Sequence, residues 1–372
     1  MTFIEYVPSG IELFVTPDSW NCWWKENSVL KHDWLLQSYV YAKRYKENTM
    51  REELKIRKGV NIIGDSGGFS LATGTINYLN PIDVLRWEET NVDYGLILDK
   101  IPCFFEGSEN QFRLASRSEA QPFLKQTAEN GMQMLRAKEN DKLKLLYICH
   151  GFEWDYMNDG LNYLKQAGGS LDMFAGVSIS RKGNNPYTFM EQLFWIKEHI
   201  QEGQHLHLLG ISGFRTTPLI HYIMRDMKNI SITYDSTGYL KGSKRREYIS
   251  PFNIKHPIII NKNSLNEVIC DCEICKLFEG KDLNKVDNQM DISRMLCLHN
   301  LKMFLNYNKA LNKLVEHPEE FRRFNSSISG GNEDLFMVMD YAEKEGFLKA
   351  KERYKNKFLF DSGLKQGSIF DF

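Results

Sequence analysis

The sequence of 372 residues lacks several features that would indicate a membrane, secreted or disordered protein. It contains no stretch of about 20 consecutive apolar residues, the length that a membrane-spanning helix needs. Its first residues, Met-Thr-Phe-Ile-Glu-Tyr, do not follow the basic and then apolar order of a signal peptide. No internal repeat or low-complexity segment is visible, and 42% hydrophobic residues are enough for a large core. We therefore expect a folded, cytoplasmic protein with no membrane partner.

An excess of positive charge is also absent. Lys and Arg number 47 and Asp and Glu 48, so the formal net charge is -1. Any contact with a polyanion must then come from local basic patches. Cysteine is scarce, with seven residues, and three of them are crowded together. An odd number with this spacing fits reduced thiols and a metal better than a disulfide framework.

Short apolar runs recur along the chain, and most precede a small polar residue and then a stretch with helical character. Continuous apolar runs of this length are typical of strands buried on both faces, and the segments between them can hold crossover helices. Eight such units predict an α/β fold, a (β/α)8 TIM barrel. The predicted strands lie at 11–15, 61–63, 94–98, 145–149, 173–178, 207–209, 230–234 and 257–260.

The pattern changes after about residue 265, where the cysteine cluster precedes helical segments. We predict a barrel core in residues 1–264, a zinc-binding subdomain in 265–310 and a C-terminal helical segment that packs on the barrel in 311–372. The apolar helices of this last segment could also serve a homodimer.

A metal site is predicted from Cys270, Cys272 and Cys275, followed by His299 on a later helix. Three thiolates and one imidazole form the ligand set of a closed tetrahedral zinc site, which holds structure rather than catalysing. The alternative is a group of neighbouring cysteines beside an unrelated histidine. We expect structural Zn2+, because seven scattered cysteines would rarely place three within six residues.

Polar residues gather just after the predicted strands, at Asp65-Ser66-Gly67-Gly68, Asp99, His150-Gly151, Gly210 and Asp235-Ser236. In a TIM barrel these carboxyl ends of strands form one rim, where active sites lie. An Asp after a strand is often only the N-cap of the next helix, and Asp-Ser-Gly-Gly is also a serviceable turn. No aspartate taken singly establishes catalysis.

Three motifs together are more specific. Gly64-Asp65-Ser66-Gly67-Gly68-Phe69, then Tyr234-Asp235-Ser236, then Cys-x-Cys-x-x-Cys with Leu298-His299-Asn300-Leu301 occur in this order. In this order they resemble the tRNA-guanine transglycosylase superfamily, and most of all the DNA 7-deazaguanine transglycosylases of phages and bacteria. The resemblance covers roughly residues 60 to 305 and implies a zinc-containing TIM barrel.

The resemblance also implies roles for individual residues. It makes Asp235 the nucleophile and Asp65 the general acid/base, with Phe69 stacked on the substrate base and Leu209 on its other face. It places the rest of the base-binding pocket at Ser66, Gly67, Gly68, Asp99, His150, Gly151, Gly176 and Val177. His150 stands where a Gln is usual, which could alter the base that is accepted.

These residue types suit base exchange. A carboxylate can hold the sugar carbon as a covalent glycosyl-enzyme while one base leaves and another enters. A second carboxyl can carry the proton that the two bases exchange. Asp99 could accept hydrogen bonds from the donor edge of guanine, in a nucleotide that has left its stack. We predict exchange of guanine in DNA for a 7-deazaguanine such as preQ0.

Other functions remain open. The Ser236 to Ser243 segment after the predicted nucleophile resembles both the archaeal enzymes and the DNA 7-deazaguanine transglycosylases of phages and bacteria. The N-terminal segment is atypical of the tRNA enzymes, and we therefore favour DNA, yet a queuosine- or archaeosine-type tRNA-guanine transglycosylase would use the same chemistry. A non-catalytic nucleic-acid-binding or partner subunit would not need both aspartates, and a nucleoside hydrolase would not explain the cysteine cluster. Helper proteins are a further open point.

Two more clusters have a structural and a functional interpretation. Lys241, Lys244, Arg245 and Arg246 lie just past Asp235. A charge run is usually a solvated face, but its position here favours contact with nucleic-acid phosphates. Trp20, Trp23 and Trp24 could stack on bases or pack, and we favour packing.

Overall fold

The computed structural model describes residues 3–10, 22–43, 49–105, 111–180, 185–211, 213, 215–250, 253–260, 270–277, 289–329, 333–358 and 365–366. Eight parallel strands form its central sheet. They are β1 (Ile4–Pro8), β2 (Trp34–Ser38), β3 (Asn61–Asp65), β4 (Tyr94–Leu96), β7 (Lys144–Cys149), β8 (Gly176–Ser180), β9 (His205–Leu209) and β10 (Ser231–Ser236).

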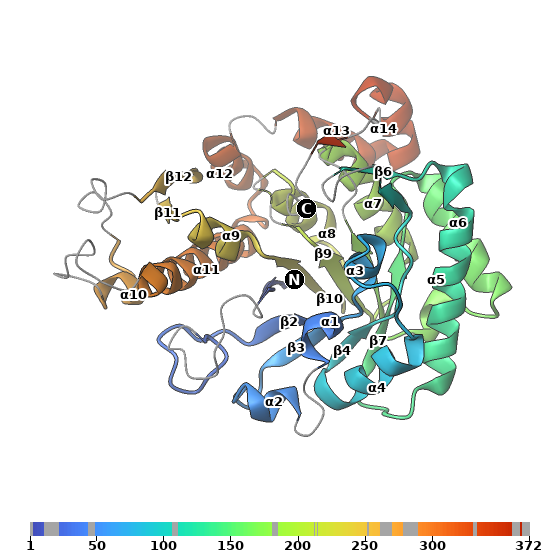
Figure 1. Ribbon diagram of the computed structural model, residues 1–372. Coiled ribbons are helices and arrows are strands. Elements are labelled where there is room, and N and C mark those ends of the chain that lie inside the picture. Colours follow the sequence, from blue (N-terminus) through green and yellow to red (C-terminus); the bar gives the residue numbers. More distant parts are fainter. Residues whose placement is uncertain are drawn as a thin grey trace.

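The sheet curls into a nearly closed barrel (Figure 1). Its strand order is β1-β10-β9-β8-β7-β4-β3-β2, so that chain neighbours are also sheet neighbours. Strands β1 and β2 at the two ends of this order lie close to each other without a backbone ladder. The predicted eight-stranded parallel barrel with surrounding helices is confirmed.

Helices connect the strands and cover the outside of the barrel. They are α1 (Tyr39–Ala42), α2 (Met50–Glu53), α3 (Gly68–Ala72), α4 (Pro81–Asn91), α5 (Arg117–Ala137), α6 (Trp154–Gln166), α7 (Pro186–His199), α8 (Thr217–Met224) and α9 (Gly238–Lys244), with a 3-10 turn at Leu171–Met173. Local sequence sets their starts, as at α4, where Asn80 caps the helix and Pro81 takes its first position. At α5, Ser116 and Glu119 form a capping box.

Side chains close the seam between β1 and β2. Asn312 accepts a hydrogen bond from the backbone N–H of Ile4 at 3.2 Å and donates one to its carbonyl at 2.8 Å. A ring nitrogen of His32, just before β2, lies 2.7 Å from the carbonyl oxygen of Tyr6. These contacts satisfy backbone groups that a ladder between β1 and β2 would otherwise pair.

Two of the predicted strands need comment. Residues 257–260 were expected to form a barrel strand, but Pro257 to Ile259 belong to β12 (Asn253–Ile259), which pairs antiparallel with β11 (Glu247–Ser250). That prediction was wrong, because an apolar run does not reveal which sheet a strand joins. The predicted strand at 11–15 lies outside the described residues. The barrel instead uses β1 and β2.

Beyond the barrel, α10 (Glu273–Lys276) carries part of the cysteine cluster, and the long α11 (Gln289–Leu314) packs on β1 and α9. The hairpin β11–β12 and α10 extend to one side of the barrel, opposite α5 and α6 (Figure 1). A small antiparallel sheet contains β5 (Cys103–Phe105), β6 (Gln111–Leu114) and β13 (Lys365–Gln366).

The last helices are α12 (Pro318–Ser329), α13 (Glu333–Glu345) and α14 (Phe347–Arg353), followed by a 3-10 turn at Lys355–Lys357. They are tied to α7 by Lys351, whose Nζ lies 2.8 Å from the buried carboxylate of Glu191. The ring of Phe347 stacks on Phe194 and Trp154. In the ranges that the structure describes, no helix combines the length and apolar character that crossing a membrane would require.

Candidate active site

The carboxyl ends of the barrel strands bring the predicted catalytic aspartates to one rim. Asp65 is the last residue of β3, and Asp235 is the penultimate residue of β10. Asp99 follows β4 by three residues, His150 comes directly after β7, and Leu209 ends β9. Parallel strands make this rim a shared edge, so residues distant in the chain become neighbours.

Two groups of β9 and the residue after it lie close to one oxygen of the Asp235 carboxylate. The backbone N–H of Gly210 donates to its Oδ1 at 2.8 Å, and Nε2 of His207 lies 3.6 Å from the same oxygen. The side chain is buried, with 7% of the residue exposed. A carboxylate fixed through one oxygen keeps the other in a defined direction, which suits a nucleophile.

Asp65 has a different environment. The pKa of its carboxyl is raised to about 6, mainly by burial among surrounding protein atoms and also by the negative charges of Asp99 and Asp235. Hydrogen bonding by Ser38 and by the N–H of Gly67, which lies 3.3 Å from Oδ1, opposes this increase in pKa. Part of the residue remains accessible. A carboxyl that takes up and releases its proton near neutral pH suits a general acid/base.

Asp99 is buried and fixed by two neighbours. Its Oδ2 lies 2.9 Å from Nε2 of His150, which is itself buried. Its Oδ1 lies so close to Gly68 that a Cβ at that position would be 2.0 Å away. The Asp99 carboxyl occupies the space that a side chain at position 68 would need, so only glycine fits there.

The Ser66 to Phe69 segment forms the entry to α3. Gly67 caps the helix with a φ of 87°, a conformation that glycine adopts without strain. Ser66 is buried, whereas the Phe69 side chain is unusually open for an aromatic, with 41% of the residue exposed. An exposed ring beside the rim carboxylates could stack on a planar ligand.

Other predicted pocket residues divide between the two ends of the barrel. Gly151 lies on the rim after β7, where Gln192 of α7 donates to its carbonyl at 2.6 Å and to that of Ser180 at 3.1 Å. Gly176 and Val177 are the first residues of β8, level with His205 and Leu206 at the amino end of β9. The structure does not bring these two to the rim, because the residues of β8 that reach it are at its other end.

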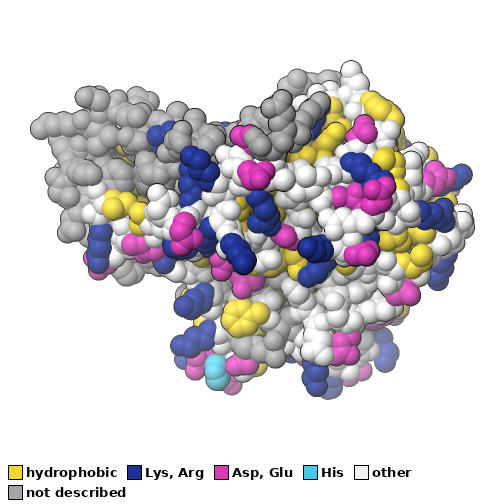
Figure 2. All heavy atoms as spheres, turned by 90° about the horizontal axis from the view of Figure 1, so that it is seen from below, with side chains coloured by type: hydrophobic (Ala, Val, Ile, Leu, Met, Phe, Trp, Pro, Cys, Tyr) yellow, Lys and Arg dark blue, Asp and Glu magenta, His cyan; other side chains and the backbone are white. Residues whose placement is uncertain are grey.

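The basic segment lies just after β10, within α9 and the residues that follow it. Lys244 and Arg245 are exposed, while Lys241 and Arg246 are partly buried. Arg245 makes two contacts with Glu247, at 2.6 and 2.9 Å, so its charge is partly balanced. On the face shown in Figure 2, basic and acidic side chains are interspersed, in keeping with the net charge of -1.

Two residues of this site were not predicted. His207 lies in the middle of β9 and Gln192 inside α7, and both are buried. Neither residue follows a strand, and the prediction of rim residues considered only polar residues that directly follow strands. An alternating pattern in His205-Leu206-His207-Leu208 could have shown that two histidines face the same side of β9.

The predicted metal ligands come together. The donor atoms of Cys270, Cys272, Cys275 and His299 all lie within 4.8 Å of one another. Nδ1 of His299 is 3.5 Å from the Cys272 sulfur and 3.3 Å from the Cys275 sulfur. Sulfurs bound to one zinc at about 2.3 Å would be about 3.8 Å apart, so the group has the size of a single metal site.

The surroundings of His299 fit a metal ligand. Its Nε2 lies 2.9 Å from the carbonyl oxygen of Ile249, and donation there leaves the Nδ1 lone pair facing the thiols. The Tyr248 ring stacks on the imidazole at 4.0 Å. The cluster thereby joins α10, α11 and the β11–β12 hairpin, and these four residues could hold a metal ion.

No protein-family model matches this chain, and no curated protein matches it. A functional assignment is therefore argued from the rim carboxylates and the Cys3His group themselves.

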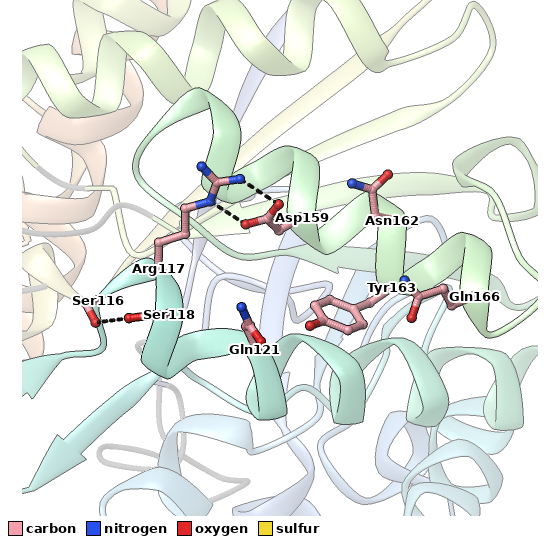
Figure 3. A pocket seen from close by; sticks show the side chains of 8 residues that line it. All are labelled: Ser116, Arg117, Ser118, Gln121, Asp159, Asn162, Tyr163 and Gln166. Atoms are coloured by element: carbon pink, nitrogen blue, oxygen red, sulfur yellow. Dashed lines mark hydrogen bonds and ion pairs between the residues drawn. The ribbon is translucent and has the colours of Figure 1, made fainter.

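A groove of about 620 Å³ lies away from the rim, between α5 and α6 (Figure 3). Its lining is Ser116, Arg117, Ser118, Gln121, Asp159, Asn162, Tyr163 and Gln166. Arg117 points toward Asp159 and donates to its Oδ1 at 2.8 Å. None of the rim residues lines this groove, so cavity size does not indicate the chemistry here.

The tryptophans behave as expected for packing. Trp23 and Trp24 are buried and meet edge to face at 4.6 Å, and Trp23 also contacts Tyr239. Trp20 lies outside the described residues.

Proposed function

We propose that this protein is a guanine transglycosylase that replaces guanine in DNA with a 7-deazaguanine base. One observation carries the proposal: Asp235, held by the Gly210 N–H, shares a rim with Asp65, a carboxyl with a pKa of about 6. A nucleophile and a proton carrier are what base exchange without hydrolysis requires.

In the first step, a carboxylate oxygen of Asp235 attacks C1′ of the target nucleotide, and the bond from C1′ to the guanine nitrogen breaks. Protonated Asp65 gives its proton to the departing guanine. In the second step, the incoming base attacks C1′, its proton passes to Asp65, and the bond to Asp235 breaks. Each residue returns to its starting state, so the net reaction exchanges one base for another.

Recognition of the base is assigned to Asp99 and Phe69. Asp99 is a buried acceptor, and guanine and its 7-deaza analogues present N–H donors that adenine lacks at the same edge. Its contact with His150 at 2.9 Å fixes its orientation before a base arrives. The exposed Phe69 ring offers a stacking surface for a flipped nucleotide.

The Cys3His group is assigned to Zn2+. A closed set of three thiolates and one imidazole leaves no position for substrate, so the metal would hold the β11–β12 hairpin and α10 against α11. The rim carboxylates perform the chemistry without it.

The choice of DNA rests on the resemblance of the segment after Asp235 to DNA-modifying members of the superfamily. The basic residues Lys241, Lys244, Arg245 and Arg246 follow Asp235 directly, which suits contact with phosphates on either side of a flipped nucleotide. tRNA is the other polymer that the same chemistry would serve.

Incubation of the protein with radiolabelled guanine and either double-stranded DNA or unmodified tRNA tests this function. Label should enter DNA with the wild-type protein and with Asp141→Ala, an exposed control, and should be lost with Asp235→Ala and Asp65→Ala. If label entered tRNA alone, the substrate would be tRNA and not DNA. No label in either polymer would contradict the proposal and favour a non-catalytic binding role.

A further inference from the structure

A series of polar side chains runs through the inside of the barrel between β9 and β10 and ends at Asp235. Ser231 Oγ lies 3.1 Å from Nδ1 of His205, and Nε2 of His205 lies 2.8 Å from Oγ1 of Thr233. The same Thr233 oxygen lies 2.8 Å from Nδ1 of His207. Ser231 is exposed at the amino end of the barrel, whereas the next members are buried.

The number of protons limits the direction of these hydrogen bonds. Thr233 has one hydroxyl proton, so it can donate to one imidazole and must accept from the other. If Thr233 donates to Nδ1 of His207, then Nε2 of His207 carries its proton and His205 donates to Thr233. The opposite direction would leave the Nε2 lone pair of His207 facing a carboxylate, which is electrostatically unfavourable. Asp235 therefore selects the first arrangement.

His207 has no better partner than Asp235 for that proton. Its ring is fully buried, and its Nε2 makes no hydrogen bond to the residues that the structure describes. Oδ1 of Asp235 lies 3.6 Å away, and a shortening of about 0.7 Å would give a normal N–H···O distance. Catalytic hydrogen bonds are often long without substrate and shorten in the reacting complex.

We propose that His207 is a positioning residue that donates its Nε2 proton to Oδ1 of Asp235 during base exchange. This inference rests on the proposed function and deepens it. Together with the Gly210 N–H, His207 gives Oδ1 two donors, so Oδ2 is the oxygen that attacks C1′. Thr233 sets the tautomer, and His205 sets the direction in which Thr233 donates.

The two donors act in both steps. As Oδ2 bonds to C1′ and the guanine bond breaks, Oδ1 becomes the carbonyl oxygen of the ester and remains hydrogen-bonded. When the incoming base displaces Asp235, the electron pair of the C1′–Oδ2 bond returns to the carboxylate. Donors on Oδ1 stabilise that returning charge, which makes Asp235 a better leaving group. His207 keeps its proton throughout.

The environment of His205 supports a neutral imidazole at that residue. Burial lowers the pKa of His205 well below its ordinary value, and the neighbouring His207 and Lys144 lower it further. A neutral ring carries one proton, as the proposed direction requires.

The tautomer can be measured without any assay of transfer. In protein labelled with 15N at histidine, two-bond nitrogen–proton spectra distinguish the Nε2–H form, the Nδ1–H form and the imidazolium, and His207→Gln identifies the signal. We expect wild-type His207 to be neutral with its proton on Nε2, and Thr233→Val to remove this preference. An Nδ1–H form or an imidazolium in the wild type would overturn the proposal.

A second experiment measures the effect on exchange. His207→Phe should lower kcat for label incorporation by about 10- to 100-fold with KM changed less than about twofold, since only the donor to a charged oxygen is lost. His207→Gln, whose side-chain N–H can reach the same oxygen, should recover most of kcat. Equal rates for wild type and His207→Phe would overturn the proposal. Absence of exchange in the wild type would reject the proposed function instead, and the tautomer would still be decided by the spectra.

Discussion

Asp65 and Asp235 lie on the same rim of the barrel, at the ends of β3 and β10, yet their surroundings differ in ways that suit the different roles proposed for them. Asp235 accepts a hydrogen bond from the backbone N–H of Gly210, whereas burial and two nearby negative charges favour the protonated form of Asp65. These differences suit the proposed roles of Asp235 as the nucleophile and Asp65 as the proton carrier.

Asp65 should make the stability of the protein depend on pH. Its folded-state pKa of about 6 exceeds the ordinary value of 3.8, so its favourable contribution is fully present below about pH 4 and is lost as pH rises through 6. Asp65→Asn removes this effect. We expect it to increase the free energy of unfolding by roughly 1–3 kcal/mol at about pH 8 and by little at about pH 4, measured by denaturant titration.

The exposed Asp141 provides the control, because Asp141→Asn should leave the stability nearly the same at both values of pH. A pH-independent effect of Asp65→Asn would show that its carboxyl titrates normally in the folded protein.

The absence of a side chain at Gly68 should be needed for the position of the Asp99 carboxyl and therefore for binding of the base. An alanine Cβ would lie 2.0 Å from Oδ1 of Asp99, so Gly68→Ala must displace that carboxyl. We expect KM for guanine to increase about tenfold or more, because a small displacement of a positioned group has a large effect.

Gly160→Ala is the matched control. It lies on α6, and its nearest neighbour would be 3.9 Å away, so this change should stabilise the helix by about 0.5–1 kcal/mol without altering KM. Unchanged binding of guanine by Gly68→Ala would remove Asp99 from the base-binding site.

The predictability of these residues follows from their places in the fold. Asp65 and Asp235 could be placed on the rim from the sequence, because each stands where an apolar run ends, and the resemblance of their motifs then singled them out. His207 could not, since a histidine inside a strand faces either the barrel interior or the helices, and only the register with Thr233 shows which. Gly176 was assigned to the pocket by resemblance, although its strand has barely begun at that point.

At the scale of elements, apolar runs predicted most barrel strands but not their partners. The Pro257 to Ile260 run and the runs of the barrel look alike in sequence, yet β12 pairs with β11 outside the barrel. Pairing depends on contacts between distant parts of the chain, which periodicity does not contain. Strand β2 was missed, although Trp34 to Gln37 includes the apolar Leu35 and Leu36.

The Cys3His group connects two helices, because its cysteines lie on and beside α10 and its histidine lies on α11. We expect elemental analysis to find about one zinc per chain and Cys272→Ser to lose it. The midpoint of thermal unfolding should then fall by about 5 °C or more. Cys297→Ala is the control, since Cys297 lies two residues from His299 but outside the ligand group. Full zinc content in Cys272→Ser would exclude this cysteine as a ligand.

For the whole molecule, the nearly balanced charge means that the proposed binding to DNA would depend on a local basic patch. Lys244 is exposed just past β10, so Lys244→Ala should weaken DNA binding similarly across sequences if the proposal holds. The slope of log affinity against log salt concentration should decrease by about one. Lys142, exposed before β7 at the amino end of the barrel, is the control and should have no effect. Equal effects of both changes, measured by titration at several salt concentrations, would argue against contact at this rim.

The sequence alone determined the class of fold and the four candidate metal ligands, because strand burial and ligand spacing are local properties that the pattern of residues records. It also placed the two aspartates after apolar runs, but only the resemblance of their motifs to a known family selected them from the other polar residues at strand ends. The tertiary structure decided which strands close the barrel, that Asp99 fills the space left by Gly68, and that His207 points at Asp235. These depend on which residues of different strands lie at the same level of the barrel, and that arrangement exists only once the strands have paired.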